Sequence, residues 1–410
     1  MKKRETKRTE IALFGHFDST NFGNESTLKA ILDHLRRFHP DAEVTCICTG
    51  PEATIAAHHI HAIPISEPFV KSWAPRNLVT KALRKICIGL PSEPIRWVKA
   101  FLRLRNTDML IIPGTGLLTD AYGLSNWGPF SLFKWSLMAK ICRCKLLFVS
   151  VGAGPIHGTL GRYFVKSILS LADFRSYRDN SSKQYLLDLG FPADSDPVYP
   201  DLAFSLPEAV ISQQDGGESN NRPIVGLGVM TASGAYDVLR PSNTYTAYLD
   251  KLVTFGEWLL AREYDVRLLS GDVGDEHALQ EFGNRLRARS SDYDDARIIR
   301  QPISSVDDLL SQITATDIVV ATRFHNVLLA LFCNKPVISL SFHHKCESLM
   351  SAVGLSEYCL DIKDCDADML IEKFRALEKN ADNIKPLIKQ KVRGFREALD
   401  EQYRCIFNLV

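Results

Sequence analysis

Two basic residues separated by one position, Arg323 and His325, could together bind an anion and transfer a proton. An arginine guanidinium binds phosphate or carboxylate through a planar pair of N–H donors, and a histidine exchanges a proton near neutral pH. A second basic group, His344-Lys345, follows further along the chain. These types of residue indicate a site for an anionic ligand that also needs proton transfer. The alternative is an arginine on the surface and a structural histidine at a helix start.

The elements predicted around these residues would bring the two basic groups together. A β-branched run at 318–320 predicts a buried strand that ends just before Arg323, and apolar spacing over 327–332 predicts a helix after it. The run 336–340 predicts a second strand, which ends just before His343, His344 and Lys345. Parallel strands end at the same edge of an open α/β sheet, where ligands commonly bind. We therefore expect both basic groups at that edge, beside a helix start.

Length and composition are those of a globular protein with more than one domain. The chain has 410 residues, of which 45% are hydrophobic and 24% charged. That length suits two domains of about 200 residues each. The formal net charge of +1 argues against nucleic-acid binding, which usually requires a basic excess.

The cysteines and the apolar runs bear on the cellular compartment. The ten cysteines include no Cys-x-x-Cys pair, so we expect reduced thiols and a cytoplasmic protein. The basic first ten residues lack the apolar region of a signal peptide. The most apolar stretch, 132–151, contains four basic residues, so we expect no membrane span.

Predicted strands and helices alternate in two successive runs. In the first run, strands end in loops rich in glycine and polar residues, where the backbone can approach a ligand closely. These loops contain Asn21, Gly23, Asn24, Gly114, Gly116, Asp120 and Gly154. Asn24 is the predicted N-cap of the first helix.

A polar, glycine-rich segment at 208–222 separates the two runs and predicts a linker. We therefore expect an N-terminal domain over 1–207, a C-terminal domain over 223–383, and a helix over 384–410 that crosses back to the first domain. Both runs predict doubly wound, Rossmann-like α/β domains with parallel sheets, and the two domains are expected to face a cleft.

Residues 69–105 differ in composition from the rest of the first run. They carry nine basic residues against one acidic residue, Glu93, with aromatic and apolar residues between them. One interpretation is the solvated basic face of ordinary helices. The other is a patch that rests on an anionic membrane surface and holds a lipid-linked substrate.

Three further clusters have structural alternatives. His58, His59 and His61 lie in a predicted loop with no partner at ligand spacing, so no metal site is predicted there. The acidic residues at 292–295 are interpreted as solvated surface. Arg178-Asp179, directly after a predicted strand at 174–177, is either an anion contact or a structural ion pair.

In their order along the chain, these motifs resemble those of the polysaccharide pyruvyl transferase family, over nearly the whole sequence. The matching motifs are Asn21-Phe-Gly-Asn-Glu25, Gly114-Thr-Gly116 with Asp120, Val151-Gly-Ala-Gly-Pro155, Arg178-Asp-x-Ser181, Asp201-x-x-Phe204, and Arg323-Phe-His325 with Lys335-Pro336 and Lys345.

The resemblance implies a fold similar to that of two-domain glycosyltransferases of the B type. It also implies transfer of pyruvate from phosphoenolpyruvate to two hydroxyls of a sugar, as a ketal in a cell-surface polysaccharide or its lipid-linked precursor. Phosphoenolpyruvate is then a co-substrate, and no metal or other cofactor is expected. Arg323 and His325 are expected to be catalytic and to bind the donor, with Arg178, His344 and Lys345 as further donor contacts. The glycine-containing loops of the first run are assigned to the acceptor.

Two other functions remain open on the sequence. One is a nucleotide-sugar-dependent glycosyltransferase of the B type, and the other is a non-catalytic glycan-binding protein. Contact with the inner face of an anionic membrane through residues 69–105 is a further hypothesis about the location.

Overall fold

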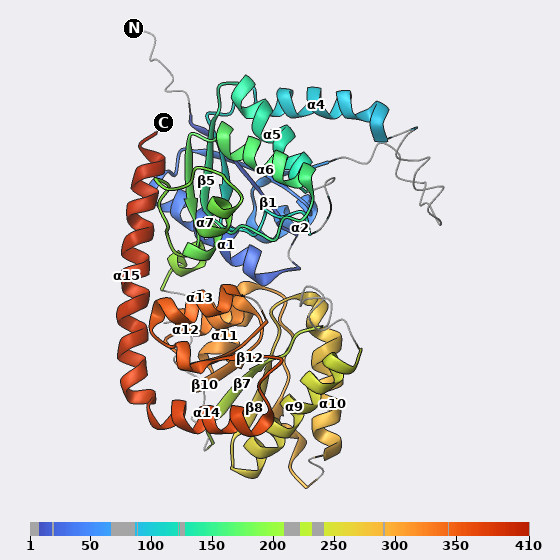
Figure 1. The fold of residues 1–410 in the computed structure, drawn as a ribbon, viewed down its shortest axis with the longest axis vertical. Helices are drawn as coiled ribbons and strands as arrows, with labels where there is room; N and C mark the ends of the chain where they lie inside the picture. The colour runs from blue at the N-terminus through green and yellow to red at the C-terminus, as the bar shows by residue number, and fades with distance from the viewer. Residues whose placement is uncertain are drawn as a thin grey trace. The chain divides into compact units, whose positions relative to one another are not determined.

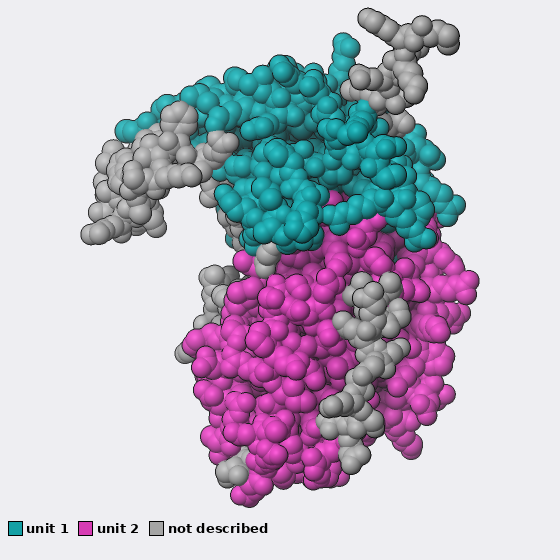
Figure 2. Space-filling view, turned by 180° about the vertical axis from the view of Figure 1, so that it is seen from behind, with its two compact units in different colours: residues 1–18, 34–201, 402–410 teal, residues 19–33, 202–401 magenta. Residues whose placement is uncertain are grey.

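The computed structural model describes residues 8–18, 20–66, 87, 89–121, 123, 128–208, 222–231, 242–289, 292–342 and 344–409. The contacts divide the chain into two compact units, coloured separately in Figure 2. Unit 1 comprises residues 1–18, 34–201 and 402–410, and unit 2 comprises residues 19–33 and 202–401. The sequence boundaries did not anticipate that residues 19–33 belong to unit 2. Most of the predicted linker lies outside the described residues.

Unit 1 is built on a six-stranded sheet with the order β3-β2-β1-β4-β5-β6. Its strands are β1 (Glu10–Gly15), β2 (Glu43–Cys48), β3 (His61–Pro64), β4 (Met109–Pro113), β5 (Lys145–Val151) and β6 (Phe174–Tyr177). Strand β1 pairs in parallel with both β2 and β4. The central strands β1, β4 and β5 are almost entirely buried, as expected for parallel strands covered by helices on both faces.

Helices alternate with these strands along the chain (Figure 1). They are α2 (Pro51–His58), α4 (Leu90–Leu104), α5 (Pro129–Ile141), α6 (Thr159–Leu171) and α7 (Asn180–Asp188). The core under them contains Phe14, Ile112, Phe148 and Trp135. The segment around His58 and His61 is not the loop that we expected, because α2 ends at His58 and β3 begins at His61. Both elements are too short for periodicity to reveal them.

Unit 2 repeats the same topology with a second six-stranded sheet, in the order β12-β11-β10-β7-β8-β9. Its strands are β7 (Ile224–Gly228), β8 (Asp265–Leu269), β9 (Ile298–Ile299), β10 (Ile318–Ala321), β11 (Val337–Ser341) and β12 (Cys359–Asp361). Its helices are α9 (Ser242–Ala261), α10 (Glu276–Arg289), α11 (Val306–Thr314), α12 (Phe324–Phe332), α13 (His344–Val353) and α14 (Ala367–Lys379). Two Rossmann-like α/β units confirm the predicted fold class.

In both units the strand order reverses beside the first strand, between β1 and β4 and between β7 and β10. In open α/β sheets, ligands bind outside the carboxyl ends of the strands at such a reversal. The end of β10, where Arg323 follows, is therefore the position of interest in unit 2.

Two long helices contribute residues to both units, namely α1 (Phe22–Phe38) and α15 (Ala381–Phe407). All ten cysteines are free thiols. Among the described helices, none combines the length and the apolar character needed to cross a membrane.

Candidate functional site

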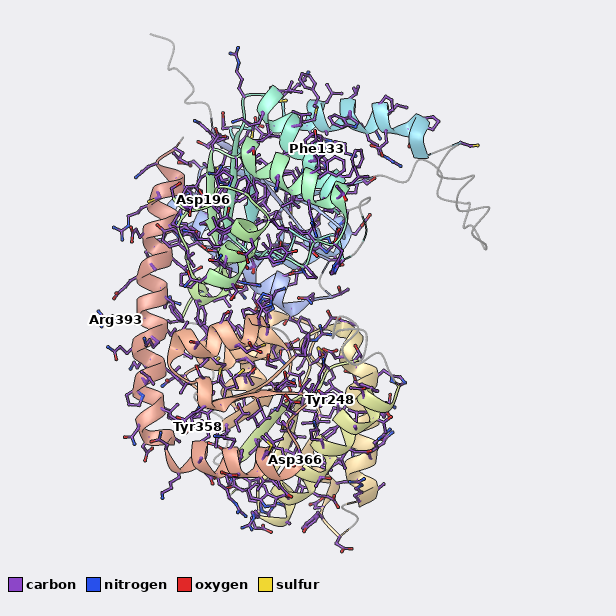
Figure 3. The ribbon with its side chains drawn as sticks, in the orientation of Figure 1. Phe133, Asp196, Tyr248, Tyr358, Asp366 and Arg393 are labelled. Carbon is purple, nitrogen blue, oxygen red and sulfur yellow. The ribbon has the colours of Figure 1, made fainter. Side chains whose placement is uncertain are left out.

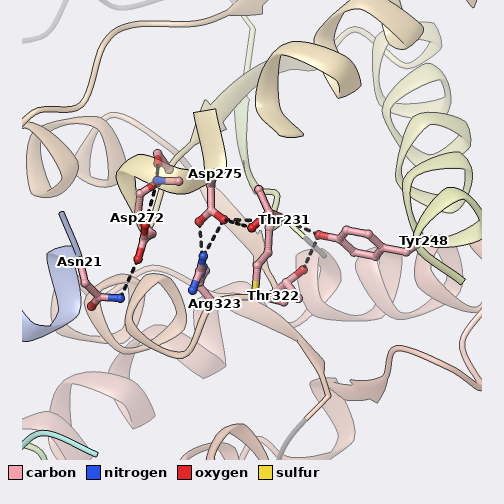
Figure 4. Close-up of polar contacts among 10 residues, drawn as sticks. Asn21, Thr231, Tyr248, Asp272, Asp275, Thr322 and Arg323 are labelled. Carbon is pink, nitrogen blue, oxygen red and sulfur yellow. Dashed lines mark hydrogen bonds and ion pairs between the residues drawn. The ribbon is translucent and has the colours of Figure 1, made fainter. Parts of the chain in front are cut away.

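Arg323 lies at the carboxyl end of β10, where it is the residue before the first turn of α12. Its guanidinium makes two parallel hydrogen bonds to Asp275, from Nε to Oδ2 at 2.8 Å and from Nη2 to Oδ1 at 2.6 Å (Figure 4). Asp275 is completely buried. No described residue accepts a hydrogen bond from Nη1 of Arg323. The bidentate pair therefore fixes the orientation of the guanidinium and leaves one of its nitrogens for a ligand.

A network of polar groups holds Asp275 in place (Figure 4). The backbone N–H of Thr231, after β7, donates to Oδ1 of Asp275 at 3.0 Å. The hydroxyl of Tyr248, on α9, lies 2.9 Å from that of Thr322 at the end of β10. The loops after β7, β8 and β10 are thus joined at the reversal of strand order.

The same environment keeps Arg323 charged. Burial alone lowers the pKa of a guanidinium, but the hydrogen bonds and the charge of Asp275, with the charge of Asp272, raise the pKa of Arg323 above its ordinary value. Arg323 is therefore a permanent cation at any physiological pH.

His325, two residues further on in α12, packs directly on the start of α1. A Cβ atom on Gly23 would lie only 1.9 Å from Nδ1 of His325, so no side chain fits at position 23. The ring of Phe324 meets that of His325 edge to face at a centroid distance of 5.0 Å. The glycine loop that the sequence assigned to the acceptor thus lies beside the predicted proton-transfer residue.

Three hydrogen bonds within unit 2 join this loop to the loop after β8. Nδ2 of Asn21 donates to Oδ2 of Asp272 at 2.9 Å, and the loop's backbone pairs with residues 271 and 273 on either side (Figure 4). Oδ1 of Asn21 also accepts hydrogen bonds from the backbone N–H groups of Gly23 and Asn24, both at 3.1 Å. Asn21, not Asn24, is therefore the N-cap of α1, because its side chain satisfies the two amides of the first turn.

His344 and Lys345 are the first two residues of α13, which begins three positions after the end of β11, and both are half-buried. Strand β11 pairs in parallel with β10. The structure therefore brings these residues to the same edge of the sheet as Arg323, as the sequence predicted. His343 lies outside the described residues.

Arg178 belongs to unit 1, where it follows β6. Its Nη1 lies 3.2 Å from Oδ2 of Asp201, and its Nε lies 3.5 Å from Oδ2 of Asp179. Burial opposes the charged form, yet these carboxylates raise the pKa of Arg178 above its ordinary value. Of the two alternatives in the sequence, the ion pair is present, and a contact with the donor remains a prediction.

The other predicted residues of unit 1 tie together the loops after β4 and β5. Asp120 accepts hydrogen bonds from the backbone N–H groups of His157 at 2.9 Å and Gly158 at 2.6 Å, just before α6. The N–H of Gly154 donates to the carbonyl of Leu118 at 2.8 Å. Gly114 is buried and Gly116 is exposed. These residues lie at the carboxyl edge of the sheet as expected, and their contact with an acceptor remains a prediction.

Sequence reasoning missed two buried residues near Arg323, namely its ion-pair partner Asp275 and the amide residue Asn326. Asp275 directly precedes α10, so in the sequence it resembles an ordinary acid at a helix start. Asn326 is fully buried, and neither polar atom of its side chain has a hydrogen bond to a described residue. Its amide lies against Gly228 and Gly271, where added Cβ atoms would come within 2.9 Å and 2.8 Å. The sequence offered one indication that Asn326 belongs to the site, namely its position next to His325.

Comparison with known proteins gives a family match over most of the chain. A family model described as polysaccharide pyruvyl transferase matches residues 21–344. The amylovoran biosynthesis protein AmsJ of Erwinia amylovora is 19% identical over 424 residues, which cover 93% of this chain and 95% of AmsJ.

The fold is also similar to those of several solved structures. UDP-GlcNAc 2-epimerase from Neisseria meningitidis, bound to UDP-GlcNAc, matches with a TM-score of 0.61 and 11% identity, over 98% of this chain and 100% of the epimerase. Anabaena Alr3699/HepE in complex with UDP and glucose matches with a TM-score of 0.56 and 13% identity, over 97% of this chain and 100% of HepE. At such low identity these similarities show the fold alone, which is that of B-type glycosyltransferases.

Proposed function

Because this chain belongs to the polysaccharide pyruvyl transferase family, we propose that it transfers pyruvate from phosphoenolpyruvate to two hydroxyls of a sugar, forming a ketal. The sugar would be part of a cell-surface polysaccharide or its lipid-linked precursor. The name of AmsJ, an amylovoran biosynthesis protein, supports a role in polysaccharide synthesis.

One observation carries this proposal beyond the family match. At the reversal of strand order in unit 2, a guanidinium held by Asp275 lies two residues from a histidine, and His344 and Lys345 are at the same sheet edge. Phosphoenolpyruvate carries both a phosphate and a carboxylate, so its site needs several cationic donors. Asp275 offsets much of the charge of Arg323. We therefore assign Arg323 to orienting the donor, and Lys345 and His344 to balancing its charge.

The reaction requires proton transfer at two stages. A proton adds to the methylene carbon of phosphoenolpyruvate, which leaves an oxocarbenium-like centre at the neighbouring carbon. One sugar hydroxyl bonds to that centre and loses its proton. The carbon–oxygen bond to phosphate then breaks, and the second hydroxyl closes the ketal and loses its proton to the departing phosphate. Each turnover converts phosphoenolpyruvate and a diol into a ketal and inorganic phosphate.

We assign to His325 the proton transfer to the methylene carbon and the proton transfer from the first hydroxyl. It is half-buried, it can act as acid or base, and its ring is positioned by Gly23 and Phe324. Arg178 and the loops with Asp120 and Gly154 are assigned to the remaining donor and acceptor contacts.

A test of this function measures inorganic phosphate. The protein is incubated with phosphoenolpyruvate and a panel of sugar acceptors, and we expect phosphate release that depends on one class of acceptor. Replacement of His325 by alanine is expected to abolish it. A B-type glycosyltransferase would instead release nucleotide from a nucleotide sugar, and a glycan-binding protein would release neither product. Either of those outcomes contradicts the proposal.

A further inference from the structure

Helix α4 in unit 1 has two contrasting faces. Ala100 and Leu104 are buried in the core of the unit. On the other side four large apolar side chains are exposed, and we call these residues the α4 face. They are Ile95 (43% exposed), Val98 (57%), Phe101 (39%) and Leu102 (50%). Such a cluster on one helix marks an interaction surface more often than scattered single residues do.

A basic cavity lies beside the α4 face. It has a volume of about 290 Å³ and is bounded by residues 63–66 at the end of β3, by α4, and by Trp135 of α5. Three basic residues of α4 line it, namely Arg96, Lys99 and Arg103. The rest of its wall is mostly apolar, including Ile63 and Ile65. The cavity therefore combines a positive charge with an apolar surround.

Two of the three basic residues, Arg96 and Arg103, are not fully paired among the described residues. Glu93, the one acidic residue of α4, is shared between Arg96 at 2.5 Å and Lys134 at 3.4 Å. Nε of Arg96 is buried, with no hydrogen-bond partner among the described residues. The side chain of Arg103 makes no ion pair in the described part of the chain. An anion in the cavity would supply the missing acceptor.

We propose that α4 docks on an anionic lipid surface, with the α4 face among the lipid chains and one lipid phosphate in the cavity. Cationic side chains interleaved with exposed apolar ones are the pattern of helices that lie in a membrane interface. A soluble phosphate would account for the cavity, but not for the adjacent apolar residues. This inference rests on unit 1 and is independent of the proposed reaction.

Vesicle flotation tests the inference with the full-length protein. The vesicles contain either phosphatidylcholine alone or phosphatidylcholine with phosphatidylglycerol. We expect flotation only with phosphatidylglycerol, and a loss of binding at high salt. The double variant Lys99→Gln/Arg103→Gln should lower the partition coefficient about 25-fold, because each basic residue near such a surface contributes about five-fold. Val98→Ser/Leu102→Ser should lower it at least as much.

Matched controls distinguish the α4 face from the general surface. Lys389→Gln/Arg393→Gln removes two exposed charges from α15, where Arg393 projects from the helix (Figure 3). Leu160→Ser/Tyr163→Ser removes two exposed apolar residues from α6. Both controls are expected to float like the unchanged protein. All four variants alter exposed residues, so their thermal unfolding midpoints should match that of the unchanged protein.

Three results would overturn the inference. They are an absence of flotation with either vesicle, an equal loss of flotation in the control variants, and displacement of the protein from vesicles by millimolar inorganic phosphate at constant ionic strength. The last result would identify a site for soluble phosphate. Flotation needs neither phosphoenolpyruvate nor a sugar. A failure of flotation would therefore not contradict the proposed reaction, which is tested separately by phosphate release.

Discussion

Asp275 fixes the guanidinium of Arg323 but leaves Nη1 without a partner among the described residues. A guanidinium that is already oriented loses little conformational freedom when an anion binds. This arrangement also buries the carboxylate of Asp275, which among the described residues forms an ion pair with Arg323 alone. At the scale of the residue, stability and ligand binding therefore rest on the same ion pair.

Replacing Asp275 by asparagine tests this dependence. We expect the free energy of unfolding to fall by about 3 kcal/mol, because the substitution breaks a buried ion pair and leaves a mostly buried cation unpaired. The measurement is chemical denaturation followed by circular dichroism. Asp307→Asn is the control, since Asp307 pairs with Lys29 but is half exposed, and its removal should cost less than about 1 kcal/mol. Equal losses in the two variants would show that burial of Asp275 contributes nothing.

At the scale of the element, the start of α1 shapes the surroundings of His325. Asn21 caps the helix and binds Asp272, and Gly23 leaves the space that the imidazole occupies. A short loop far away in the sequence is thus part of the edge at which β8 and β10 end.

Gly23→Ala is expected to displace His325. The added methyl group would overlap Nδ1, so the ring must move, and a shift of about 1 Å at a catalytic group can lower kcat about a hundred-fold. KM for phosphoenolpyruvate should change much less, since Arg323 is not touched. Gly394→Ala on α15 is the control, because its Cβ would have no atom within 4 Å. A Gly23→Ala variant with unchanged kcat would remove His325 from the mechanism.

Another element-scale contact gives unit 1 a dependence on pH. His34 of α1 stacks on Tyr403 at the end of α15, with ring centroids 3.8 Å apart and planes 20° from parallel. Burial lowers the pKa of His34 from 6.5 to about 4, and the nearby His39 and Arg37 act in the same direction. His34 is therefore protonated at a higher pH in the unfolded chain than in the folded protein.

The stabilisation from neutral His34 is complete above pH 6.5 and is lost as the pH falls toward 4. The thermal unfolding midpoint should decrease over that range. His34→Phe keeps the stacked ring without the proton site, so its midpoint should decrease less. Part of the decrease in the midpoint should remain in His34→Phe, because burial also lowers the pKa of His16 to about 4. Identical pH profiles for the two proteins would refute this account.

At the scale of the whole molecule, the sequence predicted what periodicity encodes. Alternating apolar runs gave two parallel sheets, and the strand ends gave the edge where Arg323, His344 and Lys345 lie. The pairing of one side chain with another, in contrast, leaves no periodic pattern in the sequence. Nothing in the sequence links Asp275 to Arg323, and the assignment of residues 19–33 to unit 2 depends on contacts with loops more than 200 positions away. The N-cap of α1 was misplaced because Asn21 and Asn24 are equally good capping residues.

The most direct test of the proposed chemistry follows the proton that reaches the donor. The reaction is run in deuterium oxide with phosphoenolpyruvate and the acceptor that supports phosphate release, and the product is analysed by mass spectrometry and proton NMR. We predict a pyruvate ketal whose methyl group carries one deuterium, and no such product from the His325→Ala variant. A product without that deuterium, or transfer that persists undiminished without His325, would contradict the account.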